Sequence, residues 1–338
     1  MTTNSSVCVI IAAKNAGATI ARAVRSALAE AETFEVVVVD DGSTDGTGAE
    51  AFSADDGSGR LNIIRFDENR GPAAARNRAI DASTAPLLAI LDADDFFLPG
   101  RFTQMMAEDQ WDFIADNIVF VKEECVARVS TDVKHFHRHA RLLALEDFIA
   151  GNISRRGAQR GEIGFLKPVM RREFLDRHRL RYNEKLRLGE DYDLYARALA
   201  ARARYKIIHS CGYGAVVRHD SLSGKHRTED LKRLYEADRA LLASGLLTQE
   251  QKTLLRQHEK HIRDRYELRH FLDLKNSRGP MAALAYAATH PAAIPAIVGG
   301  IAADKKEAFV GSAPRPPSPQ TAGHLRYLLP VIADADQR

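Results

Sequence analysis

Runs of consecutive apolar residues alternate with helix-like segments along the first hundred residues of the chain. The runs predict strands over residues 7–12, 34–39, 61–66 and 87–91, and the intervening segments predict helices over 18–31 and 72–82. Because the runs do not alternate apolar with polar positions, we expect strands that are buried on both faces, as in a parallel sheet covered by helices. The pattern therefore predicts an α/β fold.

Beyond residue 95 the pattern is less regular. It predicts strands over residues 113–121, 124–130, 205–208 and 213–217, and helices over 142–150 and 191–203. From 228 to 274 apolar residues recur at helical spacing among many charges, which predicts a helical extension. Residues 280–303 are Ala-rich but interrupted by His290, Pro291 and Pro295, so they fit either a helix along a membrane surface or a packed helical hairpin, and not a membrane span.

Composition and charge narrow the class of protein. The 338 residues include 48 Lys and Arg against 45 Asp and Glu, and a net charge of +3 predicts no nucleic-acid partner. The three cysteines, Cys8, Cys125 and Cys211, are too few and too widely spaced for a disulfide framework or a zinc cluster. Together with an N-terminus unlike a secretory signal, they predict a cytoplasmic protein.

Acidic residues follow two of the predicted strands. Asp92 and Asp94 come directly after the strand at 87–91, and in an extended chain their side chains would point the same way and share a divalent cation. Mg²⁺ or Mn²⁺ held by so few carboxylates completes its shell with water and phosphate oxygens, so the implied ligand is a nucleotide diphosphate. Alternatively, Asp94 and Asp95 only begin a turn before Pro99.

Two further blocks of polar residues stand at comparable places. Asp40 and Asp41 end the second predicted strand, where they could hold a ligand or form a turn before the next helix. Arg70 and Arg76 flank the start of the helix at 72–82, whose small residues allow either close approach to phosphates or tight packing on the sheet.

These blocks, taken together, resemble family 2 glycosyltransferases with the GT-A fold. The resemblance is carried by the segments 9–15, 38–45, 69–77, 91–99 and 189–191, in this order and at this spacing. It implies a Rossmann-like, mostly parallel central sheet flanked by helices, with a C-terminal helical extension. The expected domains are a transferase domain over 1–225, with a nucleotide-sugar half to about residue 100 and an acceptor half beyond it, the extension over 226–310, and a loosely packed tail over 311–338.

The resemblance also implies an activity and roles for particular residues. The chain is expected to move a sugar from a nucleotide-sugar to a hydroxyl acceptor with inversion, and Asp191 falls on the general base that takes the proton of that hydroxyl. The metal, Mn²⁺ or Mg²⁺, falls to Asp94 and Asp92, with His219 as a further candidate near the donor. The residues expected to bind the donor are Ala12, Asn15, Asp40, Asp41, Arg70, Arg76, Asp92 and Ala93.

The segment 167–223 resembles, more narrowly, bacterial exopolysaccharide glucosyltransferases of the succinoglycan-assembly type. That likeness implies UDP-glucose as the donor and a polyprenyl-diphosphate-linked oligosaccharide as the acceptor, at the cytoplasmic face of the inner membrane. One departure concerns the first loop, where Lys14 replaces the aromatic residue that often precedes Asn15 in the family, and this puts base stacking there in doubt.

Other readings of the same residues remain open. A nucleotidyltransferase also places acids at strand ends, although the loop after the first strand lacks the glycines expected of its phosphate site. A carbohydrate-binding or scaffolding protein on the same fold would not need Asp191. The basic segments around Lys134 and Arg155 fit anionic headgroups or an ordinary solvated face, and the alternating His135, His137 and His139 would need a fourth ligand to hold zinc.

Overall fold

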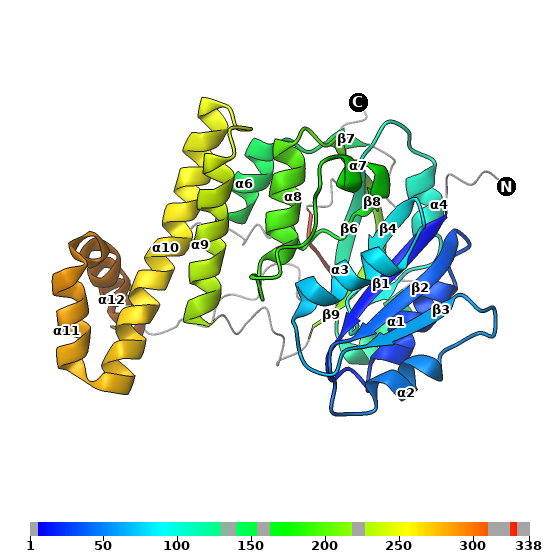
Figure 1. The fold of residues 1–338 in the computed structure, drawn as a ribbon, viewed down its shortest axis with the longest axis horizontal. Coiled ribbons are helices and arrows are strands. Elements are labelled where there is room, and N and C mark those ends of the chain that lie inside the picture. The colour runs from blue at the N-terminus through cyan, green and yellow to red at the C-terminus, as the bar shows by residue number, and fades with distance from the viewer. Residues whose placement is uncertain are drawn as a thin grey trace. The chain divides into compact units, whose positions relative to one another are not determined.

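The fold is taken from a computed structural model of the chain (Figure 1). It describes residues 6–129, 133, 140–153, 163–217, 227–309 and 325–329, with the side chains of 303–309 left out. The chain divides into two compact units. The first comprises residues 1–220 and 325–338, and the second residues 221–324.

The N-terminal half of the first unit is a parallel βα arrangement. Its strands are β1 (Val7–Ala13), β2 (Thr33–Asp40), β3 (Leu61–Arg65) and β4 (Leu87–Ile90), in the order β3-β2-β1-β4. The connecting helices are α1 (Ile20–Leu28), α2 (Thr47–Phe52) and α3 (Pro72–Ala82). All three strand pairs are parallel, as the unbroken apolar runs predict.

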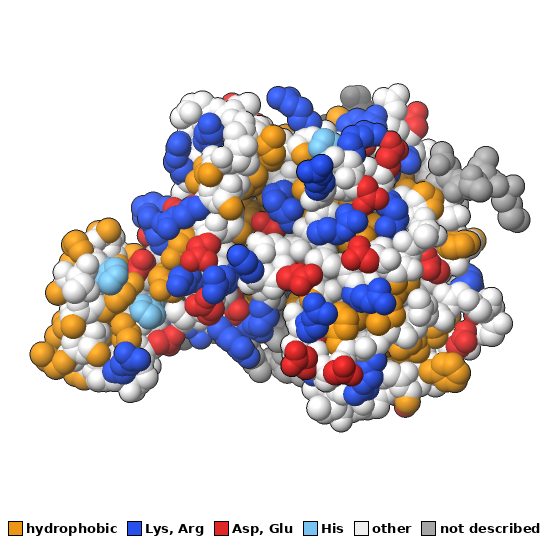
Figure 2. All heavy atoms as spheres, in the orientation of Figure 1, with side chains coloured by type: hydrophobic (Ala, Val, Ile, Leu, Met, Phe, Trp, Pro, Cys, Tyr) orange, Lys and Arg blue, Asp and Glu red, His pale blue; other side chains and the backbone are white. Residues whose placement is uncertain are grey.

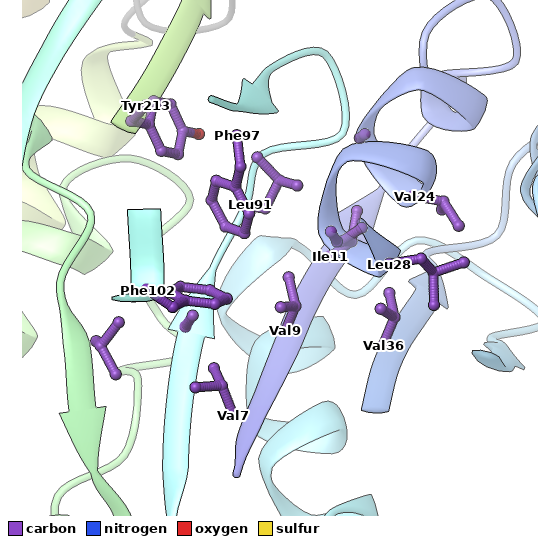
Figure 3. Packing of buried hydrophobic residues seen from close by; sticks show 14 of the residues in the cluster. Val7, Val9, Ile11, Val24, Leu28, Val36, Leu91, Phe97, Phe102 and Tyr213 are labelled. Atoms are coloured by element: carbon purple, nitrogen blue, oxygen red, sulfur yellow. The ribbon is translucent and has the colours of Figure 1, made fainter. Parts of the chain in front are cut away.

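Both faces of this sheet are covered. Val7, Val9 and Ile11 on β1 join a cluster of buried side chains with the inner face of α1 and with Phe97, Phe102 and Tyr213 (Figure 3). Cys8 and Ile10, which alternate with them, are equally buried on the face over which α3 packs. Burial on both sides fixes the register of the strands, and with it the positions of the residues at their carboxyl ends.

The sheet continues through strands of mixed direction. These are β5 (Phe96–Phe97), β6 (Phe113–Val121), β7 (Arg141–Leu142), β8 (Val169–Arg171) and β9 (Tyr205–Val216), and the order is β4-β8-β6-β9-β5 with β7 beside β9. Strand β8 is antiparallel to both of its neighbours, whereas β6 and β9 are parallel. The predicted α/β class is confirmed, and the expectation of a mostly parallel sheet applies to β3-β2-β1-β4.

The remaining helices of the first unit are α4 (Arg101–Met106), α6 (Leu145–Asn152), α7 (Arg172–Arg177) and α8 (Glu190–Ala200), with 3₁₀ turns at Glu123–Arg128 and Ile163–Phe165. The strand predicted over 124–130 is therefore wrong. Its apolar residues Cys125, Val126 and Val129 project from the 3₁₀ turn into a small hydrophobic cluster, and they do not form the backbone hydrogen bonds of a strand. The two strands predicted over 205–217 are one strand, β9, whose irregular register opposite Asn117 follows the polar interruption in the sequence.

The second unit is helical. It contains α9 (Thr228–Ala243), α10 (Gln249–Arg278), α11 (Pro280–Thr289), a 3₁₀ turn at Pro291–Ala293 and α12 (Ile294–Phe309). The helical extension predicted from 228 to 274 is present as two helices, because Gly245, with a φ of +78°, ends α9. The buried His258 of α10 hydrogen-bonds Asp238 of α9 at 2.7 Å and ties these two helices together.

Part of the expected tail returns to the first unit. Strand β10 (Arg326–Tyr327) pairs antiparallel with β6. Asn117, buried on β6, accepts a hydrogen bond from the backbone N–H of Leu329 at 2.8 Å and donates one to its carbonyl at 3.1 Å. Residues 325–329 are thus held by the sheet, because the buried amide of Asn117 forms its hydrogen bonds with the backbone of Leu329.

Candidate active site

The carboxyl ends of β1, β2 and β4 meet at one edge of the sheet, because these strands are parallel neighbours. The loops that leave this edge carry Asn15, Asp41 and Asp92. In open α/β sheets ligands bind in the crevice beyond the carboxyl ends of the strands. Three of the blocks singled out in the sequence are therefore brought together where a ligand is expected.

The first two loops are joined through Asn15. Its side-chain oxygen accepts the backbone N–H of Thr44 at 2.9 Å, and its own N–H donates to the hydroxyl of Ser43 at 2.9 Å. Asn15 has a φ of +50°, a left-handed conformation that Asn adopts more readily than most residues. Half-buried Ala12 lies opposite Val39 in the β1–β2 register. Asn15 thus sets the shape of the loops at this edge.

Asp40 and Asp41 are both buried but have different partners. Asp40 accepts the backbone N–H of Ser43 and the guanidinium of Arg65, each at 2.9 Å. Asp41 accepts the backbone N–H groups of Arg70 at 2.6 Å and Gly71 at 2.9 Å. Asp40 therefore closes its own turn, and Asp41 fixes the segment that leads into α3.

Arg70 and Arg76 on this segment differ in exposure. The Arg70 side chain is half exposed and lies over the Phe66 ring, with its guanidinium carbon 4.8 Å from the ring centre. Arg76 is buried in the second turn of α3 and points toward the N-terminus of α8. Of the two, Arg70 is accessible to an incoming phosphate, whereas Arg76 is already surrounded by carboxylates.

Arg76 and Lys167 bind three carboxylates at this point. Arg76 contacts Glu190 at 2.6 Å, Asp92 at 2.9 Å and Asp191 at 3.0 Å. Lys167, which lies just before β8, contacts the second oxygen of Asp191 at 2.7 Å and that of Asp92 at 2.9 Å. Each oxygen of Asp92 and Asp191 therefore meets one cation. We call these five residues the charged cluster.

The charged cluster controls which of its members is ionised. Burial alone would raise the pKa of Asp92, but Lys167 and Arg76 outweigh it and lower that pKa to about 2. Burial likewise disfavours the charged Lys167, yet Asp191 and Asp92 raise its pKa above the usual range. For Glu190 burial prevails, and its pKa is raised despite Arg76. Asp92 and Lys167 are thus held ionised as a pair.

Asp191 and Glu190 owe their place to the start of α8. Gly189 precedes the helix with a φ of +83°, and both acids stand in its first turn. There the helix dipole and the unpaired backbone N–H groups favour a negative charge. The Asp191 side chain is 13% exposed and that of Asp92 is 33% exposed, so Asp92 is the more open of the two carboxylates that Lys167 joins.

Asp92, Ala93, Asp94 and Asp95 form a turn, with the N–H of Asp95 bonded to the carbonyl of Asp92 at 3.0 Å. The extended geometry assumed for Asp92 and Asp94 is therefore wrong, because β4 ends at Ile90. Asp95 is buried and accepts the Tyr213 hydroxyl at 2.8 Å and the N–H of Val216 at 2.9 Å, so it anchors β9. Half-buried Asp94 follows buried Ala93 in the same turn.

The sequence assigned no role to Lys167, and Glu190 entered only as part of segment 189–191, which carries the resemblance to the family. Lys167 stands between a short 3₁₀ turn and the three-residue strand β8, where no periodic pattern marks it. A buried lysine is uncommon without a partner, but its partners here lie 24 and 75 positions away along the chain. Only the fold reveals the contact.

Several candidates lie outside the described residues. These are His219, proposed for the metal, together with His135, His137, His139, Lys134, Arg155, Arg156 and Arg160. Among the residues that the structure does describe, no group of three or more His, Cys, Asp or Glu side chains is arranged to hold a metal ion. A metal site that includes Asp94 would therefore consist of one or two carboxylates together with phosphate oxygens of a nucleotide.

Comparisons with known proteins agree with this fold. Over 328 residues the chain is 64% identical to the succinoglycan biosynthesis protein ExoU of Rhizobium meliloti strain 1021. The alignment covers 97% of this chain and 96% of that protein. Among solved structures, S. aureus TarS 1–349 in complex with UDP-GlcNAc superposes with a TM-score of 0.56 at 19% identity, covering 80% of this chain and 74% of TarS.

A mannosyltransferase of Pyrobaculum calidifontis, solved with GDP-Man and Mn²⁺, has a TM-score of 0.51 at 20% identity, over 90% of this chain and 81% of that one. At this identity the two structures bear on the fold, which is GT-A. Residues 8–223 match the model of glycosyl transferase family 2. This range contains the charged cluster and all of the strand-end acids. The chain is a glycosyltransferase and belongs to glycosyl transferase family 2.

Proposed function

We propose that this glycosyltransferase moves glucose from UDP-glucose to a hydroxyl of a polyprenyl-diphosphate-linked oligosaccharide, with inversion, during assembly of a succinoglycan-type exopolysaccharide. The observation that carries the proposal is the charged cluster, in which Lys167 and Arg76 each contact both Asp191 and Asp92 at the edge where a nucleotide-sugar is expected. The likeness to the succinoglycan biosynthesis protein ExoU supports the exopolysaccharide. The lipid-linked acceptor and the cytoplasmic face of the inner membrane are proposed from the resemblance of segment 167–223.

Asp191 is proposed as the general base. The acceptor oxygen forms a bond to the anomeric carbon as the bond from that carbon to the diphosphate oxygen breaks, and UDP leaves with the electron pair. The hydroxyl proton passes to Asp191. Each Asp191 oxygen has two lone pairs and one cation contact, so a hydroxyl can still bind there. One base and no covalent intermediate are what inversion requires.

A divalent cation, Mn²⁺ or Mg²⁺, would neutralise charge on the leaving diphosphate when it is bound. Asp94 is the proposed ligand, with Asp92 close to it in the same turn. Both Asp92 oxygens already meet cationic side chains, which leaves the greater share of coordination to Asp94 and to the donor's own oxygens. The cation is therefore expected to bind together with the nucleotide rather than before it.

The proposal is tested by calorimetric titration of UDP, UDP-glucose and GDP-mannose, each with Mn²⁺ and with EDTA. We expect UDP compounds to bind only with the metal, and Asp94→Ala to lose this binding. Asp55→Ala, which removes an exposed aspartate from the loop after α2, serves as the matched control and should bind as the wild type does. Equal binding in EDTA would contradict metal dependence, and a preference for GDP-mannose would contradict the donor.

A further inference from the structure

Helix α11 and the part of α12 up to residue 302 form a hairpin without formal charge. Residues 280–302 contain no Asp, Glu, Lys or Arg. Four large apolar side chains are exposed on it: Met281 at 75%, Leu284 at 58%, Ile294 at 42% and Val298 at 59%. Figure 2 shows hydrophobic side chains over these two helices, whereas Lys and Arg side chains gather over α9 and α10. A helix whose outer face is apolar, in addition to the face packed on its own domain, exposes an apolar surface that marks an interaction site.

The inner surface of this hairpin is already packed. Ala283, Ala293 and Ile297 are buried. Gly300 lies so close to α10 that a Cβ there would come within 2.4 Å of Leu268, so α12 rests directly on that helix. Gly299, next to it, faces open space. The exposed apolar residues are therefore additional to those that hold the second unit together.

The geometry favours lying on a bilayer over crossing it. Among the described helices none is by itself long and apolar enough to span a membrane, but 280–289 and 291–302 pass such a test as a pair, with a bend of 104° between them. At 1.5 Å per residue, α11 is only about 15 Å long, half the hydrocarbon thickness. Two short helices at a steep angle present a broad, shallow apolar surface.

Cations stand beside that surface. Arg269, Lys275 and Arg278 are exposed on the last three turns of α10, against one exposed acid, Asp273. An open groove of about 590 Å³ runs between this part of α10 and α11, with His270 and Arg278 among its lining residues. Apolar side chains bordered by cations match an anionic membrane, in which an acyl layer lies beneath anionic headgroups. A protein partner would not require apolar and cationic residues to be arranged in this way.

We propose that α11 and α12 dock the protein on an anionic lipid bilayer. Met281, Leu284, Ile294 and Val298 enter the interface between headgroups and acyl chains, and Lys275 and Arg278 contact the headgroup phosphates. The surface is separate from the charged cluster, so the inference extends the proposed function without depending on the identity of the donor. Docking would bring the enzyme to the layer in which a lipid-linked acceptor resides.

The test is flotation of the full-length protein with vesicles of phosphatidylethanolamine and phosphatidylglycerol, and with vesicles of phosphatidylcholine alone. We expect the wild type to float with the anionic vesicles, and Leu284→Glu/Val298→Glu to lose at least 10-fold in partitioning. Leu246→Glu changes an equally exposed leucine of the same unit outside the hairpin and should float as the wild type does. Lys275→Gln/Arg278→Gln should weaken binding to the anionic vesicles and reduce its salt dependence.

Three results would overturn the inference. The first is a wild type that floats with neither kind of vesicle, and the second is a double glutamate variant that floats as well as the wild type. The third is a wild-type dimer in light scattering that the double glutamate variant converts to monomer, because the hairpin would then be covered by a second copy. Calorimetric binding of UDP-glucose should be unchanged in every variant, so failure of docking and failure of the donor assignment are distinguished.

Discussion

Arg76 and Lys167 allow three carboxylates to lie close together, because Arg76 contacts all three and Lys167 contacts Asp92 and Asp191. Without these two cations, the negative charges of Asp92, Glu190 and Asp191 would repel one another, and water would screen them little because the three side chains are largely buried. Lys167, like Arg76, contacts both of the carboxylates proposed to act on the substrates. Removing one partner of a buried ion pair is costly because the other charge stays behind.

Lys167→Met should therefore lower the free energy of unfolding by about 3 kcal/mol and reduce sugar transfer. Lys206→Met is the matched control, since Lys206 forms a less buried pair with Glu108 at 3.2 Å, and we expect it to cost less than about 1 kcal/mol. Denaturant unfolding and a transfer assay measure the two effects. Equal losses of stability in the two variants would contradict the special role of Lys167.

Asp92 should make stability depend on pH in acid. Its pKa is about 2 in the fold and near 4 in an unfolded chain, so the unfolded state binds more protons between these values. The stabilisation from Asp92 is therefore complete above pH 4 and is lost as the pH falls from about 4 to 2. Unfolding of wild type and Asp92→Asn across this range should show a difference that shrinks toward pH 2. A constant difference would refute the assigned pKa.

At the residue level the sequence identified the acids but not their partners. Asp92 stands out because an acid directly after a strand is a visible pattern, and Asp191 because segment 189–191 resembles a block of the family. Their joining by Lys167 was not predictable, because a lone lysine beside a three-residue strand carries no local signal. The partners of Asp41, two backbone N–H groups, were equally invisible, since they depend on how the start of α3 meets β2.

The elements with one dominant pattern were predicted well. The helix over 72–82 and the strand over 113–121 have the predicted bounds. Where apolar residues are sparse, as in 124–130, the pattern could not separate a strand from a 3₁₀ turn. The short strands β5, β7 and β8 were missed because two or three residues are too few to show a period, and they exist because neighbouring strands supply their hydrogen bonds.

The turn after β2 is the element on which the donor edge depends most. Gly42 has a φ of +65°, and a Cβ on it would lie 2.7 Å from the backbone carbon of Glu68. Gly42→Ala should cost more than about 2 kcal/mol of stability through strain and collision, and should weaken UDP binding by displacing the segment that Asp41 holds. Gly48→Ala, whose Cβ has room in α2, should be neutral or stabilising. A wild-type melting curve for Gly42→Ala would contradict this.

On the scale of the whole molecule, chemistry and docking fall to different units. The charged cluster belongs entirely to the first unit, and the uncharged apolar hairpin to the second. The chain returns to the first unit at β10, which Asn117 holds. The sequence predicted the helical extension from its charge-rich periodicity, but not this return, since a two-residue strand after a Pro/Ser-rich stretch has no pattern of its own.

The role of Asp191 is tested most directly by one comparison of binding with transfer. Wild type and Asp191→Asn would be incubated with UDP-glucose that is radiolabelled in its glucosyl group and with a membrane extract that contains lipid-linked oligosaccharide. The affinity of each protein for UDP-glucose would be measured in parallel. We expect Asp191→Asn to bind the donor as the wild type does and to transfer glucose about 10²- to 10⁴-fold more slowly. Transfer at the wild-type rate by Asp191→Asn would show that another group takes the proton.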